Sequence, residues 1–423
     1  MAFGSSSNWP ATSRAPGIGA GVFDSIDKLG AEFASSGLVL MKYCDGASFS
    51  GHGQVELHAK HGSVRVGRHA SPQGSKTTVH FAGRGILNAA LDLLLSPAFG
   101  LAHATDVLLS GCSAGGLAAL LAAEAVRRRL LERGAPLSRF KVLSFSGVFQ
   151  GGDGSPYFEQ MRSVYTLANV SASIPAACRF LSREPWRCII GTQPLDSLPA
   201  DLPVFIEQSA LDRWQTGCVL GAQPSKFEIV QCSAGDWDRC LHFMSPLRRP
   251  APAHRLTRRG MRATLRRLAT THPPPRLQRQ ECTPGQLGAL DGFSFGFLRD
   301  LLSSAALHPE RKGNGAFLHG CHSHCPNRLN RFLIGQVSLE MAILLWWRAS
   351  PDAPASRHTH VGCLTNWSSS ADAAVARCHP SCSPLYPWPD ERKKVRLRSA
   401  DVDLALHGRI SPELLGAREV FDV

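Results

Sequence analysis

Val107-Leu108-Leu109-Ser110-Gly111-Cys112-Ser113-Ala114-Gly115-Gly116-Leu117 is the stretch of sequence on which the fold prediction rests. The apolar run at 107–109 is typical of a buried strand, and the Ala/Leu-rich run at 117–125 is typical of a helix. Between them lies the pattern G-x-S-x-G, whose small residues permit a sharp strand-to-helix turn. Such a turn exposes the hydroxyl of Ser113 and points the backbone N–H of Ala114 toward a developing oxyanion. The stretch therefore predicts a nucleophilic serine, and the alternative is a glycine-rich connection without chemistry.

Short apolar runs along the chain predict the fold class. The runs at 38–43, 107–109, 141–145 and 203–208 are typical of strands, and apolar residues at helical spacing occupy 84–95. Strands separated by helical stretches indicate an α/β fold with a mostly parallel sheet and helices on both faces. Sites in such sheets gather where strands end, and three polar residues follow expected strands: Asp45, Ser113 and Asp212.

The remaining segments give weaker structural signals. The polar segment 52–78 suits a hairpin or an excursion from the sheet. Thr283 followed by Pro284 is typical of a helix N-cap and first helical position. The apolar segment 337–347 predicts a helix packed on the core. We expect one catalytic domain over residues 1–423.

The positive charge of the chain is concentrated in one segment. The chain has 423 residues and a formal net charge of +13. Residues 241–280 contain 10 Arg and no Asp or Glu, which leaves +3 for the rest. We expect this Arg/Pro-rich segment to be a disordered insertion, and a contact with nucleic acid or an anionic polysaccharide is the alternative. Since the fold itself carries little net charge, nucleic acid is not the expected partner.

Thirteen cysteines indicate an oxidising compartment, and their odd number leaves at least one thiol without an intrachain partner. The sequence predicts a disulfide-rich C-terminal region around Cys363, Cys378 and Cys382. Sequons begin at Asn169 and Asn366. Residues 1–8 have neither the basic start nor the apolar core of a signal peptide. Since no apolar run approaches ~18 residues, we expect no membrane span.

A serine nucleophile requires a base, and the base requires a group that fixes its tautomer. In sheets of this type the chain order is serine, acid, then histidine. Asp212 follows the expected strand at 203–208 and is the candidate acid, unless it only caps a turn. The base is expected in the segment 320–325, which contains His322 and His324.

The same segment suggests a zinc site as an alternative. Its two cysteines and two histidines are all zinc-binding residue types: Cys321, His322, His324 and Cys325. Four ligands within five residues are too cramped for a tetrahedral site, and the sequence has no matching second half. Two cysteines that tie down a loop around a histidine explain the cluster better.

Five motifs together resemble the plant-type pectin acetylesterases and, more distantly, the animal deacylase Notum. The matching motifs occur in the family's order from about residue 38 to 350, apart from the Arg-rich insertion, and they lie at 43–49, 80–84, 111–117, 211–215 and 321–325. The loop Cys44-Asp45-Gly46-Ala47-Ser48-Phe49 is closer to the pectin acetylesterase branch.

The resemblance implies an α/β-hydrolase-like fold and a serine carboxylesterase mechanism. It implies that Ser113 is the nucleophile, Asp212 the acid and His324 the base, because the family's histidine directly precedes the second cysteine. The N–H of Ala114 would belong to the oxyanion hole. The implied reaction is hydrolysis of O-acetyl esters on pectin or another extracellular polysaccharide by a secreted or cell-wall enzyme. We expect no cofactor, no metal and a monomer.

The sequence also departs from the family. The family's Gly-Gly-Gly-Trp-Cys loop, which supplies oxyanion-hole N–H groups, is not found, and residues 4–10 resemble sequence just after that loop. We therefore expect an N-terminally incomplete chain. Phe145 occupies a position where relatives usually carry an acidic residue. The alternatives to an acetylesterase are a Notum-like deacylase acting on a fatty acyl group and an inactive family member.

Overall fold

The computed structural model describes residues 33, 36–58, 64–66, 69–71, 76–150, 155–221, 283–326, 332–362 and 382. Several predictions from the sequence lie outside these residues, namely those on the N-terminal segment 4–10, the insertion 241–280, the sequon at Asn366, and Cys363 and Cys378. The described part contains the G-x-S-x-G stretch and all the candidate catalytic residues.

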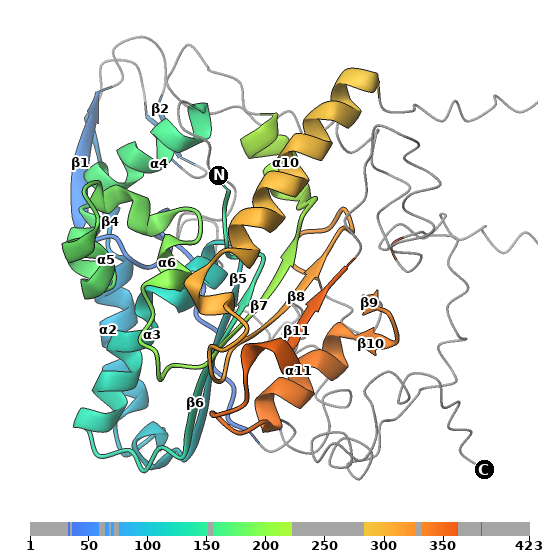
Figure 1. Ribbon diagram of the computed structural model, residues 1–423. Coiled ribbons are helices and arrows are strands. Elements are labelled where there is room, and N and C mark those ends of the chain that lie inside the picture. The colour runs from blue at the N-terminus through green and yellow to red at the C-terminus, as the bar shows by residue number, and fades with distance from the viewer. Residues whose placement is uncertain are drawn as a thin grey trace, which may run out of the picture.

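A five-stranded parallel sheet is the centre of the described fold (Figure 1). Its strand order is β11-β8-β7-β6-β5, and every neighbouring pair is parallel. The strands are β5 (Asp106–Cys112), β6 (Arg139–Phe145), β7 (Val204–Ser209), β8 (Gly315–His319) and β11 (Thr359–Val361). The predicted α/β fold with a parallel sheet is confirmed.

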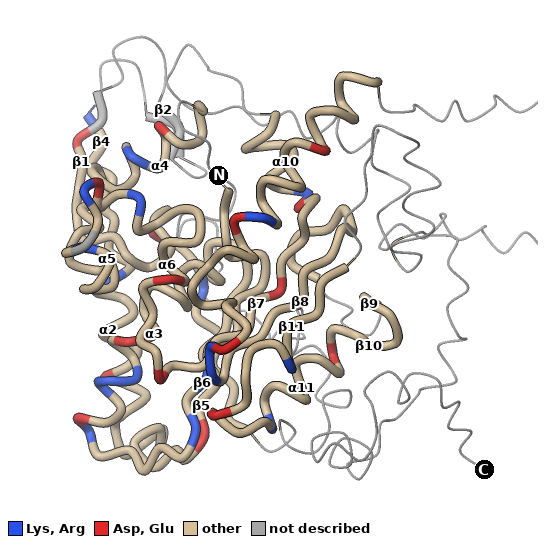
Figure 2. The backbone as a smooth tube through the Cα atoms, in the orientation of Figure 1, with Lys and Arg blue, Asp and Glu red and all other residues tan. Residues whose placement is uncertain are grey.

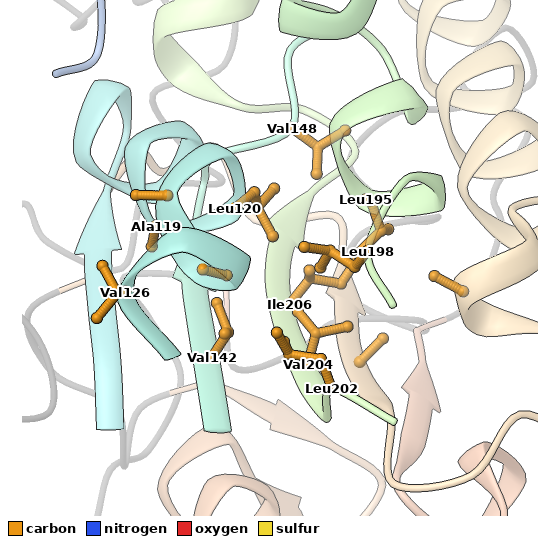
Figure 3. Close-up of a cluster of buried hydrophobic side chains, with 14 of the residues drawn as sticks. Ala119, Leu120, Val126, Val142, Val148, Leu195, Leu198, Leu202, Val204 and Ile206 are labelled. Carbon is orange, nitrogen blue, oxygen red and sulfur yellow. The ribbon is translucent and has the colours of Figure 1, made fainter. Parts of the chain in front are cut away.

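Alternating side chains of the strands enter two different cores. In β7, Val204 and Ile206 pack with the helices on one face of the sheet, whereas Phe205 packs on the other. Figure 3 shows the first of these clusters, where side chains of β6 and β7 meet Leu120 and Val126. Strands buried on both faces are typical of a parallel sheet covered by helices on each side.

Helices cover the two faces of the sheet. On one face lie α2 (Gly83–Leu94) and α3 (Ala114–Glu132), and on the other lies α11 (Leu339–Arg348). The helix α10 (Pro284–Leu302) begins with a capping box, in which Thr283 Oγ1 accepts the N–H of Gln286 and Gln286 Oε1 accepts the N–H of Thr283. The N-terminus predicted at Thr283 and Pro284 is therefore confirmed.

Shorter elements complete the described part. The segment 52–78 forms antiparallel pairs, as one of the two sequence interpretations expected: β1 (Gly53–His58) with β4 (Lys76–Phe81), and β2 (Val64–Val66) with β3 (His69–Ser71). The other short elements are α4 (Pro156–Leu167), α5 (Ala176–Leu181), α6 (Gln193–Asp196), α7 (Arg213–Gln215), β9 (Leu333–Ile334) and β10 (Val337–Ser338).

The strand predicted over 38–43 was wrong, and the helix predicted over 337–347 was wrong at its start. The segment 38–43 has no regular secondary structure, and Val39 and Leu40 are each 55% exposed. An apolar run becomes a strand only where a neighbouring strand is available to pair with it. The helix expected over 337–347 begins at Leu339, because Ser338 accepts the N–H of Met341 as the N-cap.

A buried lysine joins β6 to α11. Lys141 is 2% exposed, and its Nζ donates to the carbonyl oxygens of Trp346 and Ala349 at 2.7 and 3.1 Å. These carbonyls are at the C-terminal end of the helix, where a cation is favourable. Burial, reinforced by the nearby charge of Arg139, lowers the pKa of Lys141 to about 7. The side chain therefore fixes the end of α11 against the sheet.

Charged residues of both signs are spread over the described chain. Figure 2 shows basic and acidic residues interspersed over its helices and loops. No helix in this part is both long enough and apolar enough to cross a membrane.

Three disulfides join described residues: Cys112–Cys325, Cys178–Cys188 and Cys321–Cys382. Among the described cysteines, Cys44 has a free thiol.

Candidate active site

Ser113 occupies the sharp turn between β5 and α3. Its backbone has a φ of +58° and a ψ of −126°, a conformation that L-residues rarely adopt. The turn is held by two backbone hydrogen bonds, one from Ser113 N–H to the Phe145 carbonyl (2.9 Å) and one from Leu117 N–H to the Ser113 carbonyl (3.0 Å). This is the strained connection that the sequence predicts, with Ala114 as the first residue of the helix.

The glycines around Ser113 differ in their steric role. A Cβ on Gly111 would lie 2.1 Å from the carbonyl oxygen of Gly115, and one on Gly116 would lie 2.7 Å from that of Phe145. A Cβ on Gly115 would meet nothing within 4 Å. The turn therefore requires a small residue at Gly111 but not at Gly115.

Asp212 and His324 form the hydrogen-bonded pair of the site. The Nδ1 of His324 lies 2.7 Å from Oδ2 of Asp212, whose side chain is fully buried. The other carboxylate oxygen, Oδ1, accepts the N–H groups of Trp214 and Gln215, both at 2.9 Å. Asp212 therefore caps α7 and holds the histidine at once, so the two roles weighed from the sequence coexist.

The environment of His324 favours its action as a base. Burial lowers the pKa of His324, but the Asp212 carboxylate outweighs this effect and the net pKa is raised above 6.5. Because Nδ1 faces a carboxylate, it carries the proton of the neutral ring, and Nε2 retains its lone pair. The side chain remains 17% exposed, so the ring is not sealed from solvent.

A disulfide brings the serine and histidine segments together. Cys112 and Cys325 directly adjoin Ser113 and His324, and their Cα atoms are 5.7 Å apart although 213 positions separate them in sequence. Cys321 is bonded to Cys382. Since both cysteines of the segment 321–325 are in disulfides, they are not thiolate ligands, and the zinc site considered from the sequence is excluded for this set.

The hydroxyl of Ser113 is not engaged by another residue. Within the described part of the chain it makes no hydrogen bond, including to His324. Catalytic hydrogen bonds are often long without substrate and shorten only in the complex. The Ser113 hydroxyl thus has no hydrogen-bond partner among the described residues, and a contact with Nε2 of His324 is expected only on substrate binding.

Two other polar residues from the sequence have structural roles. His322 is buried, and its Nε2 lies 3.2 Å from the hydroxyl of Thr216, whereas the histidine that pairs with Asp212 is His324. The Asp45 carboxylate organises its own loop, because Oδ1 accepts the N–H groups of Ala47 and Phe49 at 3.1 and 3.0 Å.

Phe145 and Trp214 gain roles that the sequence did not assign. The Phe145 ring belongs to the core, and its carbonyl holds the N–H of Ser113. The Trp214 ring lies 6.3 Å from that of His324 and packs edge-on against Phe149 and Tyr157 at 5.3 and 5.5 Å. The sequence signal was the aromatic residue two positions after Asp212. The rings of Trp214, Phe149 and Tyr157 together form an apolar wall beside His324.

A separate cavity of about 280 Å³ lies between α2 and α3. Its lining includes four arginines, but neither Ser113 nor His324: Arg84, Arg128, Arg129 and Arg133. Three of these side chains form ion pairs with acidic neighbours: Arg128 with Glu132, and Arg129 and Arg133 with Asp92. The cavity is therefore distinct from the serine site.

A family model and two curated plant proteins match this chain and agree on the family. A family model described as pectinacetylesterase matches residues 1–249. Pectin acetylesterase 5 of Arabidopsis thaliana is 28% identical over 312 residues, covering 72% of this chain and 56% of the relative. Pectin acetylesterase 4 of the same plant is 27% identical, covering 73% of this chain and 59% of the relative. The chain thus spans somewhat more than half the length of these relatives.

Notum proteins are also similar to this chain. The mouse palmitoleoyl-protein carboxylesterase NOTUM is 27% identical over 224 residues, covering 50% of this chain and 39% of the relative. A solved structure of the Wnt deacylase Notum from Drosophila gives a TM-score of 0.45 at 19% identity, covering 74% of this chain and 68% of that chain.

Proposed function

The chain belongs to the pectinacetylesterase family, and from this premise we propose that it is a serine carboxylesterase with Ser113 as nucleophile, His324 as base and Asp212 as acid. One observation carries the proposal. The histidine that is hydrogen-bonded to a buried aspartate lies on the segment that is disulfide-bonded to the strained serine turn. The substrate class proposed is an O-acetyl ester on pectin or another extracellular polysaccharide.

The mechanism begins with attack by Ser113 Oγ on the acyl carbonyl carbon. As the C–O bond forms, the hydroxyl proton passes to Nε2 of His324, and the resulting imidazolium is stabilised by the Asp212 carboxylate. The carbonyl oxygen becomes an oxyanion, which the N–H of Ala114 would stabilise. This N–H belongs to the first turn of α3, where backbone donors have no partner within the helix and the helix dipole favours negative charge.

The tetrahedral intermediate then collapses and expels the sugar oxygen. His324 donates its proton to this leaving group, so the sugar hydroxyl departs and the acyl group remains on Ser113. Water attacks the acyl-serine, gives a proton to His324 and forms a second tetrahedral intermediate. Release of the acid restores the Ser113 hydroxyl. For an acetyl ester the products are the free sugar hydroxyl and acetate.

The disulfides support an extracellular or cell-wall location as part of the proposal. Three described pairs are oxidised, which is typical of secreted proteins and rare in the cytosol. The two other expectations from the sequence, one catalytic domain and a monomeric state, form part of the same proposal.

Replacement of the nucleophile tests the proposed function. Acetate release from acetylated pectin and hydrolysis of p-nitrophenyl acetate should fall by about 10⁶-fold in Ser113→Ala. The variant should keep the circular dichroism spectrum of the wild type, because a hydroxyl without hydrogen bonds is removed. Turnover of p-nitrophenyl acetate by the variant at the wild-type rate would contradict the serine mechanism. Preference for p-nitrophenyl palmitate over the acetate would instead favour the deacylase alternative.

A further inference from the structure

A second acid–histidine pair lies behind the site and takes no part in the mechanism above. Glu207 of β7 and His319 of β8 are 1% and 2% exposed, and Oε1 of Glu207 lies 2.7 Å from Nε2 of His319. The other ring nitrogen, Nδ1, accepts the N–H of Cys321 at 3.2 Å. Because Nδ1 is an acceptor, Nε2 carries the proton and donates to Glu207.

The second oxygen of Glu207 connects this pair to the catalytic loop. Oε2 accepts the hydroxyl of Ser146 at 3.2 Å. The Ser146 N–H donates to the main-chain carbonyl of Glu207 at 2.8 Å and reaches Oε2 as a second acceptor at 3.2 Å. The Ser146 Oγ in turn accepts the N–H of Cys325 at 3.1 Å. A chain of hydrogen bonds therefore runs from the buried carboxylate to the residue directly after His324.

This chain also holds the strained backbone of the site. Ser113, Ser146 and Cys325 all have positive φ values, of +58°, +46° and +55°. These conformations are unfavourable for L-residues and persist only when their surroundings fix them. The three positions are directly linked: the disulfide joins Cys325 to the neighbour of Ser113, and the carbonyl of Phe145, which precedes Ser146, accepts the Ser113 N–H.

We propose that Glu207 is a positioning residue that, through the hydroxyl of Ser146, fixes the backbone at Cys325 and so sets the place of His324 opposite Ser113. The proposal rests on the proposed function, since it assigns His324 the part of the base. Its chemical basis is that a carboxylate presents only acceptors, and two side-chain donors depend on that of Glu207: the His319 ring and the Ser146 hydroxyl.

An amide in place of this carboxylate leaves one side-chain donor without its acceptor. If the amide nitrogen of a Gln at 207 points to Ser146, the Ser146 hydroxyl loses its acceptor, although the Ser146 N–H keeps the main-chain carbonyl of residue 207. If the amide nitrogen points to His319, it meets the Nε2 proton, which cannot move to Nδ1 without opposing the N–H of Cys321. Glu207→Gln therefore changes the network at nearly constant shape.

The first test compares two buried serines of the same segment. Ser146→Ala removes the hydroxyl that links Glu207 to Cys325. Ser144→Ala is the matched control, because the Ser144 hydroxyl is equally buried and has no hydrogen-bond partner among the described residues. We expect kcat for p-nitrophenyl acetate to fall about 10- to 100-fold in Ser146→Ala, with KM nearly unchanged, because misplacement of the base affects the chemical step. Ser144→Ala should keep the wild-type kcat.

The second test is a double-mutant cycle on kcat. If Glu207 acts through the Ser146 hydroxyl, Glu207→Gln should lower kcat in the wild type but change it by less than about twofold in the Ser146→Ala background. Reaction of folded enzyme with a fluorophosphonate counts the active sites, so that kcat refers to folded protein only.

The outcomes separate this inference from the proposed function. The proposed function requires that the wild type turns over p-nitrophenyl acetate and that Ser113→Ala does not. If this difference is absent, both the proposed function and the positioning role of Glu207 are overturned. Given that turnover, equal kcat values for Ser146→Ala and Ser144→Ala overturn the positioning role. Equal losses from Glu207→Gln in both backgrounds overturn it as well. If Glu207→Gln does not fold, the comparison of the two serine variants decides by itself.

Discussion

At the scale of single residues, Asp212 combines two tasks in one carboxylate. One oxygen caps α7 through two backbone N–H groups, and the other accepts Nδ1–H of His324. Because the cap fixes the carboxylate and full burial excludes water, the acid cannot turn away from the histidine. The orientation of His324 is thus set by the backbone of the loop that follows β7.

The pH dependence of activity should report this pair. A base must be unprotonated, so kcat/KM falls as the pH drops through the pKa of His324. Since that pKa is raised, the acidic limb should lie above pH 6.5 in the wild type. Asp212→Asn keeps an oxygen for the helix cap but removes the charge, so kcat should fall about 10⁴-fold. The acidic limb of the residual activity should also move to lower pH. An unchanged limb in a folded variant would contradict the pairing.

At the scale of elements, the turn between β5 and α3 depends on close backbone approaches at two of its glycines, Gly111 and Gly116. Gly111 lies against the carbonyl of Gly115, whereas the space beside Gly115 itself is open. Gly111 and Gly116 therefore leave no room for a side chain, whereas Gly115 does.

Two alanine substitutions test this difference. Gly111→Ala should prevent the turn from closing and give little folded protein, because its Cβ would lie 2.1 Å from a carbonyl oxygen. Gly115→Ala should fold with a Tm close to that of the wild type, since alanine also favours the helix. Thermal unfolding followed by circular dichroism measures both. A stable Gly111→Ala protein would show that the turn is looser than described.

How much the sequence predicted also becomes clear at the level of elements. The parallel sheet, the helix at 84–95 and the pairing of His324 with Asp212 follow from local patterns and from the family resemblance. The strands β8 and β11 were missed, because short apolar runs do not reveal which of them will find a partner strand. The role of Glu207 could not be predicted, since it depends on contacts between strands and loops far apart in sequence.

At the scale of the whole molecule, the site is assembled from distant segments that disulfides hold together. The neighbours of Ser113 and His324 are joined by Cys112–Cys325, which closes a segment with a sequence separation of 213. Cys178–Cys188 closes a separation of only 10 and joins neighbouring short helices. The two disulfides therefore differ in how much chain entropy they remove from the unfolded state. They also differ in that only the first joins two segments of the candidate site.

Removal of each disulfide should separate stability from catalysis. In the chain-entropy estimate, replacing both cysteines of Cys112–Cys325 by alanine costs about 5 kcal/mol of unfolding free energy, against about 3 kcal/mol for Cys178–Cys188. We expect the first pair of substitutions also to lower kcat, because the loop of His324 loses its covalent anchor to the serine turn. The second pair should leave kcat within about twofold. Urea unfolding and kcat for p-nitrophenyl acetate give both quantities, and equal losses of kcat would contradict the anchoring role.

The central claim is that Ser113 carries the acyl group during turnover, and the acyl-enzyme itself is the most direct evidence for it. Asp212→Asn protein mixed with p-nitrophenyl acetate, quenched in acid and digested, can be analysed by mass spectrometry for acetylated peptides. The account predicts one acetyl group, located on Ser113 and absent when that residue is alanine. Hydrolysis by the wild type with acetylation at a different residue, or with no acetylated serine in the quenched protein, would contradict it.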